Sequence, residues 1–325
     1  MKLGKKPSIL FLDAATVDLG DIEMKSLKKQ GVYRAEDLNP KDPLPSPVLE
    51  AEILISNKYP LREAQIAALP QLRLICVAAT GTNNVDLEAA RRRGIAVSNV
   101  AGYSTPTVVE HTWMCLLALA HRLLEHDASV KTGAWGRSVH FALLDFPFRD
   151  LAGRRLGILG YGSIGRRVAK VARLFGMEVL IGKIPGGKYS GSEKRLPLKS
   201  LLKNSDFVTL HCPLTPRTQG LFNAERLAWM KPGACLLNLA RGPIVDETAV
   251  AAALKQGHLG GYAADVMAEE PPPEQHPLLD PKLSSRVLFS PHIAWASRES
   301  RQRLVEEIAK NISAFRLGRK RNRVA

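Results

Sequence analysis

Three side chains that could act together on a small acid occur in the second half of this chain. Arg241, Glu270 and His292 each come shortly after an apolar run. An arginine guanidinium can hold a carboxylate together with a carbonyl oxygen. An imidazolium can pass a proton to that oxygen, and a neighbouring carboxylate orients the ring and favours its charged form. The three residue types therefore suit the reduction of a 2-oxo acid.

Each of the three residues also has an ordinary structural explanation. Arg241 precedes a turn, where an arginine usually pairs with a surface acid. Glu270 precedes the run 271–273 of three prolines and could be a loop charge, and His292 could be a structural hydrogen bonder. The chemical interpretation therefore needs a source of hydride in the same protein.

A glycine-rich turn at mid-chain predicts that source. The short apolar segment 155–159 is followed by Gly160, Gly162 and Gly165 in the spacing G-x-G-x-x-G, and then by helix-spaced apolar residues over 166–175. Gly160 allows the turn, Gly162 lets backbone approach a pyrophosphate, and Gly165 lets the helix pack on the strand. The first amides of a helix have no internal partners and favour an anion. We expect a dinucleotide site here, with an ordinary glycine-rich turn as the alternative.

Strand-like and helix-like segments alternate along the chain, which predicts an α/β protein with two parallel sheets. The expected strands are 8–12, 52–55, 72–77 and 95–98 in a first sheet, and 155–159, 178–181, 206–210, 234–239, 261–266 and 287–289 in a second. The expected helices are 21–30, 61–69, 85–93, 108–130, 166–175, 223–230, 246–256 and 299–315, with loops at 39–47 and 133–150. Ligands of such sheets bind at the carboxyl ends of the strands, where the three polar residues lie.

The length of 325 residues is too great for one comfortable core, so two domains are expected. The last amphipathic helix should return to the first sheet. We therefore expect a flavodoxin-like substrate domain made of 1–102 and 297–325, with a Rossmann nucleotide-binding domain, 103–296, inserted in it. The helix at 108–130 is apolar nearly all round and is expected to be buried between the domains.

Composition predicts a folded, cytoplasmic protein without a membrane segment. Hydrophobic residues make up 45% of the chain, and the longest apolar run, 113–120, is far too short to cross a bilayer. The four cysteines are far apart and form no metal-type pair, so reduced thiols and no metal site are expected. They are Cys76, Cys115, Cys212 and Cys235.

The formal net charge of +15 raises the question of nucleic acid binding. Basic residues are scattered, except at 91–93 and in the tail 316–323, and no nucleic-acid motif is present. We expect no nucleic acid partner, and a solvated basic surface instead. Its positive field would help to collect anionic substrates and phosphate-bearing cofactors.

Several motifs resemble those of the D-isomer-specific 2-hydroxyacid dehydrogenases. Besides the glycine turn, they are the segments 79–86, 211–215, 230–234, 238–242, 265–271 and 291–295. The resemblance runs from about 57 to 300. It implies a discontinuous substrate domain, a central nucleotide domain and a homodimer. It also implies hydride transfer between NAD(P)H and a small 2-oxo acid.

The resemblance implies a role for each candidate residue. Arg241, Glu270 and His292 match the substrate arginine, the glutamate that supports the histidine, and the acid/base histidine. Glu270 is chosen over Glu269 because the family's acid lies five positions after the aspartate, here Asp265. The implied cofactor contacts are Thr80, Thr107, Gly160, Gly162, Ser163, Ile164, Gly165, Lys183, Cys212, Pro213, Ala240 and Asp265. The implied substrate contacts are Thr80, Gly81, Arg241, His292 and Trp295.

Lys183 departs from the pattern of NAD-preferring members, which carry an acid eighteen residues after the last glycine. A cation at that position could pair with a 2′-phosphate, so the sequence favours NADP over NAD. The alternative is that Lys183 points to solvent.

The segments at 57–58, 79–81 and 292–295 look like the glycerate dehydrogenase, or hydroxypyruvate reductase, branch of the family. Glyoxylate and other 2-oxo acids stay open as substrates. A second class of function is a dinucleotide-sensing protein like the corepressors that share this fold, although this chain has only a short basic tail. A third is a sister activity such as formate or phosphite oxidation.

Overall fold

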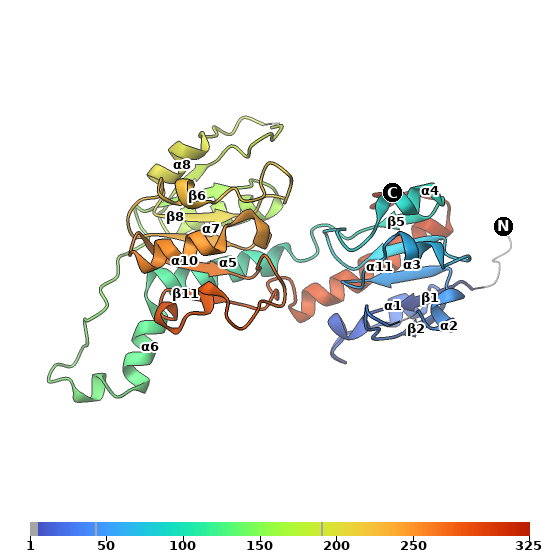
Figure 1. The fold of residues 1–325 in the computed structure, drawn as a ribbon, viewed down its shortest axis with the longest axis horizontal. Coiled ribbons are helices and arrows are strands. Elements are labelled where there is room, and N and C mark those ends of the chain that lie inside the picture. The colour runs from blue at the N-terminus through green and yellow to red at the C-terminus, as the bar shows by residue number, and fades with distance from the viewer. Residues whose placement is uncertain (1–5, 43, 190) are drawn as a thin grey trace. The chain divides into compact units, whose positions relative to one another are not determined.

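The chain forms two compact units in a computed structural model that describes residues 6–42, 44–189 and 191–325 (Figure 1). Unit 1 contains the chain up to Ser104 together with Trp295–Ala325, and unit 2 is Thr105–Ala294. Each unit is an α/β structure built on its own sheet, and the two are described separately below.

The sheet of unit 1 is parallel, with strand order β2-β1-β3-β4-β5. Its strands are β1 (Ser8–Phe11), β2 (Val32–Ala35), β3 (Ile53–Ser56), β4 (Leu74–Val77) and β5 (Ala96–Ser98). This is the doubly wound order of flavodoxin-like folds, as predicted. The sequence did not predict β2, an edge strand whose residues are mostly exposed and which therefore lacks an apolar run.

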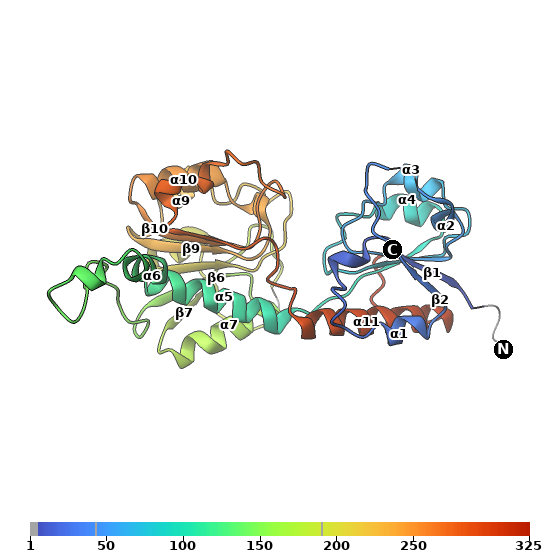
Figure 2. The same ribbon diagram turned by 90° about the horizontal axis from the view of Figure 1, so that it is seen from below.

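Helices cover both faces of this sheet (Figure 2). They are α1 (Lys25–Lys28), α2 (Ser46–Leu49), α3 (Glu63–Ala67), α4 (Leu87–Arg92) and α11 (Arg298–Arg316). The apolar stripe of α11, including Leu304 and Ile308, packs with Leu27 of α1 on one face. Ile66 and Ala89 pack on the other. The helix predicted at 21–30 is only one turn long, and the stretch expected to be a loop at 39–47 ends in α2.

The sheet of unit 2 is also parallel, with strand order β11-β10-β9-β8-β6-β7. Its strands are β6 (Arg155–Leu159), β7 (Glu178–Ile181), β8 (Phe207–Leu210), β9 (Ala234–Asn238), β10 (Leu259–Ala264) and β11 (Val287–Phe289). Beyond β7, Leu196 forms a parallel bridge with Gly182. If this bridge is counted as the third strand of the unit, the order is 3-2-1-4-5-6-7. This is the Rossmann order 3-2-1-4-5-6 with β11 added at one edge, and it confirms the predicted fold class.

The helices of unit 2 also lie on both faces of the sheet (Figure 2). They are α5 (Thr105–Ala120), α6 (Leu123–Lys131), α7 (Ser163–Leu174), α8 (Leu198–Asn204), α9 (Ala224–Leu227) and α10 (Glu247–Lys255). Val108 and Val168, from α5 and α7, pack in one core. Leu202, Leu227 and Val250 pack in the other. Short 3₁₀ turns occur at Ala14–Thr16, Trp135–Arg137, Gly242–Ile244, Pro277–Leu279 and Pro281–Leu283.

The prediction of one long helix over 108–130 is wrong. Arg122 has a φ of 51°, in the left-handed region, so α5 ends at Ala120 and α6 starts in a new direction. The apolar residues of α6 are not buried, since Leu123 and Val130 are 57% and 54% exposed. The helix therefore divides into a packed part, α5, and an exposed part, α6.

The four cysteines are free and buried. Burial raises the pKa of the Cys76 and Cys235 thiols to about 12 and that of Cys212 to about 11. These thiols are therefore protonated and unreactive near neutral pH. Within the described part of the chain, no helix has the length and apolar character needed to cross a membrane.

The carboxylate of Asp13 fixes the loop that follows β3. It accepts hydrogen bonds from the amides of Asn57, Lys58 and Tyr59 at 2.9, 2.5 and 2.8 Å. Asp13 is buried, with 7% of its surface exposed. Three consecutive amides therefore share one acceptor group at a strand end.

We predict that Asp13→Ala lowers the free energy of unfolding by about 3 kcal/mol, because buried donors are left without an acceptor. Urea unfolding followed by circular dichroism measures this. Asp37→Ala is the matched control, because Asp37 accepts a single amide hydrogen bond, from Ala15, at an exposed position. Equal losses in the two variants would contradict the assignment of Asp13 as the anchor.

Candidate functional site

The glycine turn joins β6 to α7 through backbone contacts that exclude a side chain. Gly160 has a φ of 108°, and a Cβ there would lie 2.3 Å from the carbonyl carbon of His211. A Cβ on Gly165 would lie 2.1 Å from the carbonyl oxygen of Gly160. The first glycine thus allows the turn and its contact with the segment after β8, and the third allows the helix to approach the strand.

The start of α7 has the features of a site for a diphosphate. Gly162 is the N-cap, and it caps the helix with no side chain. A Cβ on Gly162 would meet no atom within 4 Å, and the first turn, which contains Ser163 and Ile164, carries no acidic residue. Backbone amides at the start of a helix attract anions. At Gly162 there is open space beside these amides for such an anion. These residues fit a dinucleotide.

His292 and Glu270 form a close pair. The imidazole Nδ1 of His292 lies 2.6 Å from Oε2 of Glu270, and the other carboxylate oxygen accepts the amide of Met267 at 3.0 Å. The side chains of His292 and Glu270 are 25% and 37% exposed. A carboxylate at Nδ1 sets the orientation and tautomer of the ring, which directs its chemistry to Nε2.

Asp265 holds the loop that carries His292. Its buried carboxylate accepts hydrogen bonds from the Ser290 hydroxyl at 2.6 Å and from the amides of Ile293 and Ala294 at 2.8 Å each. These bonds fix the residues on both sides of His292, which itself has a φ of 55°. The predicted contact of Asp265 with a nicotinamide stays a prediction.

The turn that carries Arg241 is fixed by Asn238 at the end of β9. The Asn238 side chain donates to the carbonyl of Arg241 at 3.0 Å and accepts the amide of Ala240 at 3.2 Å. The Arg241 guanidinium donates to the Ala240 carbonyl at 2.6 Å. A Cβ on Gly242 would lie 1.9 Å from the backbone of Met267, so the turn rests directly on the segment before Glu270.

Three loops of unit 2 therefore bring the predicted trio to one edge of its sheet. Arg241, Glu270 and His292 follow the carboxyl ends of β9, β10 and β11, which are adjacent strands. The glycine turn follows β6 at the same edge, since all strands of the sheet are parallel.

Glu247 and His276 are two residues of this region that the sequence did not reveal. Glu247, in the first turn of α10, accepts the amide of Ala268 at 2.9 Å, and its other oxygen lies 3.0 Å from Nε2 of His276. Both side chains are almost fully buried. An acid in the first turn of a helix is common, so spacing alone gave no signal. The Glu247 carboxylate holds the Ala268 amide, which is next to the Met267 amide that donates to Glu270.

The other predicted residues divide between the units. Thr80, Gly81 and Trp295 belong to unit 1. The Thr80 hydroxyl donates to the carbonyl of Val100 at 2.9 Å, and the Trp295 ring meets Tyr103 edge-on at 6.3 Å. In unit 2, Thr107 lies in the first turn of α5, while Cys212 and Pro213 belong to the segment against the glycine turn.

Lys183 is exposed and follows β7, with its amide bonded to the carbonyl of Leu196. Residues 191–195 lie against the glycine turn. There the Arg195 guanidinium lies 5.8 Å from the ring centre of Tyr161, and Arg166 lies 4.9 Å from the same ring. The two guanidinium groups flank the carboxylate of Glu193. Its own backbone hydrogen bond and Arg166 hold the pKa of Glu193 below its usual range.

A family model described as the D-isomer specific 2-hydroxyacid dehydrogenase, NAD binding domain, matches residues 113–294. The chain belongs to this family. The NAD-binding domain of the dehydrogenase thus corresponds to unit 2, where the glycine turn lies.

Two relatives carry names of the branch that the sequence suggested. A glycerate dehydrogenase of Methylorubrum extorquens is 42% identical over 84% of this chain and 85% of its own. A hydroxypyruvate reductase of Blautia hydrogenotrophica is 34% identical over 95% and 97%.

Solved structures with the same fold cover nearly the whole dehydrogenase. The TT0316 protein of Thermus thermophilus has a TM-score of 0.84 and 36% identity, covering 98% of this chain and 100% of that one. A D-lactate dehydrogenase of Aquifex aeolicus, complexed with NAD and lactic acid, has a TM-score of 0.83 and 29% identity, covering 96% of each chain.

We predict that Glu247→Ala loosens the segment that leads to Glu270, because the Ala268 amide loses its acceptor. Hydrogen–deuterium exchange of the peptide covering 267–270 should become roughly tenfold faster. Glu247→Gln keeps an oxygen at the same place and is the matched control, so its exchange should stay close to that of the unchanged protein. Equal exchange in all three proteins would show that Glu247 does not hold this segment.

Proposed function

We propose that this dehydrogenase reduces hydroxypyruvate or glyoxylate with NAD(P)H and catalyses the reverse oxidation of D-glycerate or glycolate. The observation that carries the proposal is the 2.6 Å pair of His292 and Glu270 in the unit that holds the dinucleotide turn. Relatives named glycerate dehydrogenase, hydroxypyruvate reductase and, at 38% identity, glyoxylate reductase of Korarchaeum cryptofilum support this substrate class.

The cofactor, when bound, supplies the hydride that is transferred to the carbonyl carbon. The amides of Ser163 and Ile164, beside Gly162, would hold its diphosphate. The residues that would lie along the rest of it are Thr80, Thr107, Cys212, Pro213, Ala240 and Asp265.

His292 would act as the acid in the reductive direction. Its imidazolium gives the Nε2 proton to the carbonyl oxygen, and in the oxidative direction the neutral ring takes the proton back. Glu270 holds Nδ1 and stabilises the charged ring. The Arg241 guanidinium binds the substrate carboxylate and polarises the carbonyl. His292, supported by Glu270, thus supplies the proton, and Arg241 stabilises the negative charge that develops on the oxygen. The three residues come from adjacent loops.

We assign the substrate-binding role to unit 1. The loop at Thr80 and Gly81 follows β4, and its amides would hold the substrate carboxylate, while Trp295 would wall the site. This assignment corresponds to the expected substrate domain 1–102 with 297–325, and gives the nucleotide-binding role to 103–296.

The exposed stretch 139–144 of unit 2 supports a homodimer. Val139, Phe141 and Leu144 on it are 93%, 95% and 83% exposed. Apolar side chains exposed together along one segment mark an interaction surface, and a second copy of the chain is the partner that the family suggests. The four free buried thiols favour a reducing compartment such as the cytoplasm.

The corepressor-like alternative has less support, because the relatives above are named as dehydrogenases and reductases. Rapid NADPH oxidation with hydroxypyruvate, together with no shift of DNA in a gel, favours the enzyme. A DNA or protein complex in the absence of turnover would favour the binding protein.

We predict that His292→Ala lowers kcat for hydroxypyruvate by about a thousandfold, within the range for loss of an acid/base group. The dissociation constant for NADPH, measured by fluorescence, should stay within about twofold of that of the unchanged protein. The reason is that His292 is proposed to contact the substrate and not the cofactor. His258→Ala is the control and should keep normal turnover, because this histidine contacts the Leu227 carbonyl instead, at 3.1 Å. Unchanged turnover in His292→Ala would remove that residue from the mechanism.

We infer from Lys183, Arg166 and Arg195 that NADPH is used at least as well as NADH. Lys183 follows the end of β7, where a 2′-phosphate would be carried, and Arg166 and Arg195 lie on either side of the Glu193 carboxylate. The positive charge of this surface favours the extra phosphate of NADPH.

Lys183→Asp should lower the ratio of kcat/KM for NADPH to that for NADH by about tenfold, because the aspartate repels a phosphate and can accept ribose hydroxyls. Lys203→Asp, at an exposed position of α8, makes the same charge change elsewhere and is the control. A ratio that is the same in both variants, or an NADH preference in the unchanged protein, would reject the assignment of Lys183.

A further inference from the structure

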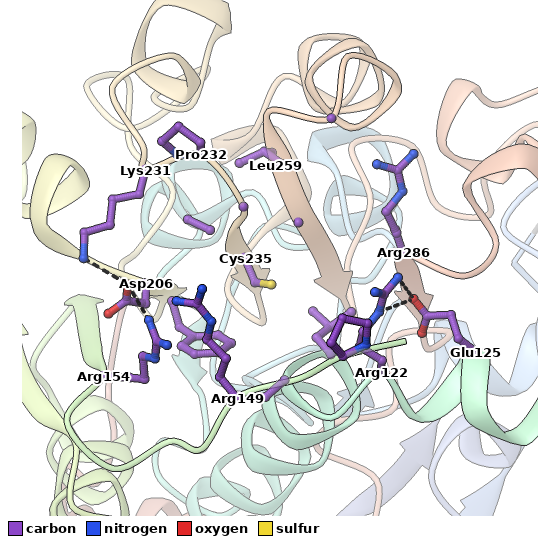
Figure 3. A pocket seen from close by; sticks show the side chains of 18 of the residues that line it. Arg122, Glu125, Arg149, Arg154, Asp206, Lys231, Pro232, Cys235, Leu259 and Arg286 are labelled. Atoms are coloured by element: carbon purple, nitrogen blue, oxygen red, sulfur yellow. Dashed lines mark hydrogen bonds and ion pairs between the residues drawn. The ribbon is translucent and has the colours of Figure 1, made fainter. Parts of the chain in front are cut away.

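A cavity of about 500 Å³ lies at the edge of the unit 2 sheet opposite to the candidate site (Figure 3). Its wall includes Phe207, Ala234 and Leu259, with which β8, β9 and β10 begin. Arg241 and Glu270 follow the other ends of these parallel strands. None of the residues predicted for catalysis, cofactor or substrate lines this cavity, so a ligand in it would be separate from the reaction.

The lining of the cavity has an excess of positive charge. Five basic and three acidic residues line it: Arg122, Arg149, Arg154, Lys231 and Arg286, with Glu125, Asp150 and Asp206. Figure 3 shows Lys231, Arg154 and Arg149 on one side, and Arg122 and Arg286 on the other. The cations therefore come from several separate segments that the fold brings around one recess.

Two of the three carboxylates are already paired within the wall. Glu125 lies 2.9 Å from the Arg122 guanidinium. Asp206 lies 2.9 Å from the Lys231 ammonium and 3.9 Å from Arg154. Asp206 also accepts the amide of Arg155, and that bond and the two cations hold its pKa below the usual range despite burial. Both carboxylates are thus occupied by cations of the wall.

The Arg149 and Arg286 side chains have neither an ion pair nor a hydrogen bond with any residue in the described ranges 6–42, 44–189 and 191–325. Asp150 is the remaining carboxylate, and it cannot neutralise both. A recess with apolar walls, here Leu119, Phe207 and Leu259, focuses such a field and strengthens it relative to open solvent. Guanidinium groups bind carboxylate and phosphoryl oxygens through paired hydrogen bonds.

We propose that this cavity binds a small metabolite with two or more anionic groups, phosphoryl or carboxylate, held by Arg149 and Arg286. Arg149 and Arg286 lie apart in the wall, so each guanidinium would bind its own anionic group. The volume of the cavity lies in the range of small-molecule sites. The cavity is an additional anion site of the dehydrogenase, and its occupation does not depend on which 2-oxo acid is reduced.

Isothermal titration of the full-length protein with pyrophosphate and, separately, with citrate tests this proposal. Saturating NADPH is present throughout, so that the glycine turn and the cations after β7 are occupied and cannot bind either probe. We expect binding of at least one probe, with pyrophosphate alone indicating a phosphoryl ligand and citrate alone a carboxylate ligand. Arg149→Gln and Arg286→Gln should each raise the dissociation constant about tenfold or more, since each removes a charged pair of hydrogen bonds.

Arg173→Gln is the matched control, because Arg173 is exposed on α7 and lies outside the cavity. Its dissociation constant should stay within about twofold of the unchanged protein. Two results would overturn the proposal: no binding of either probe, or an affinity in the Arg149→Gln/Arg286→Gln double variant that equals that of the unchanged protein. A change of oligomeric state in that double variant without a change in affinity would assign the cavity to self-association instead.

Discussion

Main-chain amides that donate to buried carboxylates hold the loops of this protein in place. Asp265 accepts two amides and a hydroxyl from the loop around His292, and Glu247 accepts the amide beside the segment that orients Glu270. Asp13 does the same for three amides in unit 1. A carboxylate has enough lone pairs to satisfy several donors at once, and burial makes each unmade bond costly. Loops anchored in this way can carry reactive groups without regular structure of their own.

Backbone packing at glycines joins neighbouring loops into one surface. Gly160 rests against His211, and Gly242 rests against Met267, at distances that leave no room for a Cβ. Strand order decides which loops can meet: β6 lies beside β8, and β9 lies beside β10. The parallel sheet therefore determines that a dinucleotide turn, a guanidinium and an imidazole–carboxylate pair share one edge, and the glycines allow those turns to approach closely.

Positive charge is not spread evenly over unit 2. One group of cations, including Arg166 and Arg195, gathers around Glu193 and the segment after β7. Another lines the cavity at the opposite edge of the sheet, where Lys231 and Arg154 share Asp206. A high net charge could have meant a uniformly solvated surface. Instead, part of it gathers around Glu193 and part around the cavity, where a positive field favours small anions.

The sequence by itself determined the glycine turn, most strands of both sheets and the choice of Glu270 over Glu269 as the partner of His292. These features depend on local spacing, apolar runs and a family pattern. The tertiary structure alone decided the break at Arg122, the edge strand β2 and the positions of Glu247 and Asp265. It also decided the convergence of Arg149 and Arg286 on one cavity. Ala268 lies 21 positions from Glu247, and Ala294 lies 29 positions from Asp265. Such pairs are brought together by chain folding and not by local spacing, so a helical or strand periodicity contains no information about them.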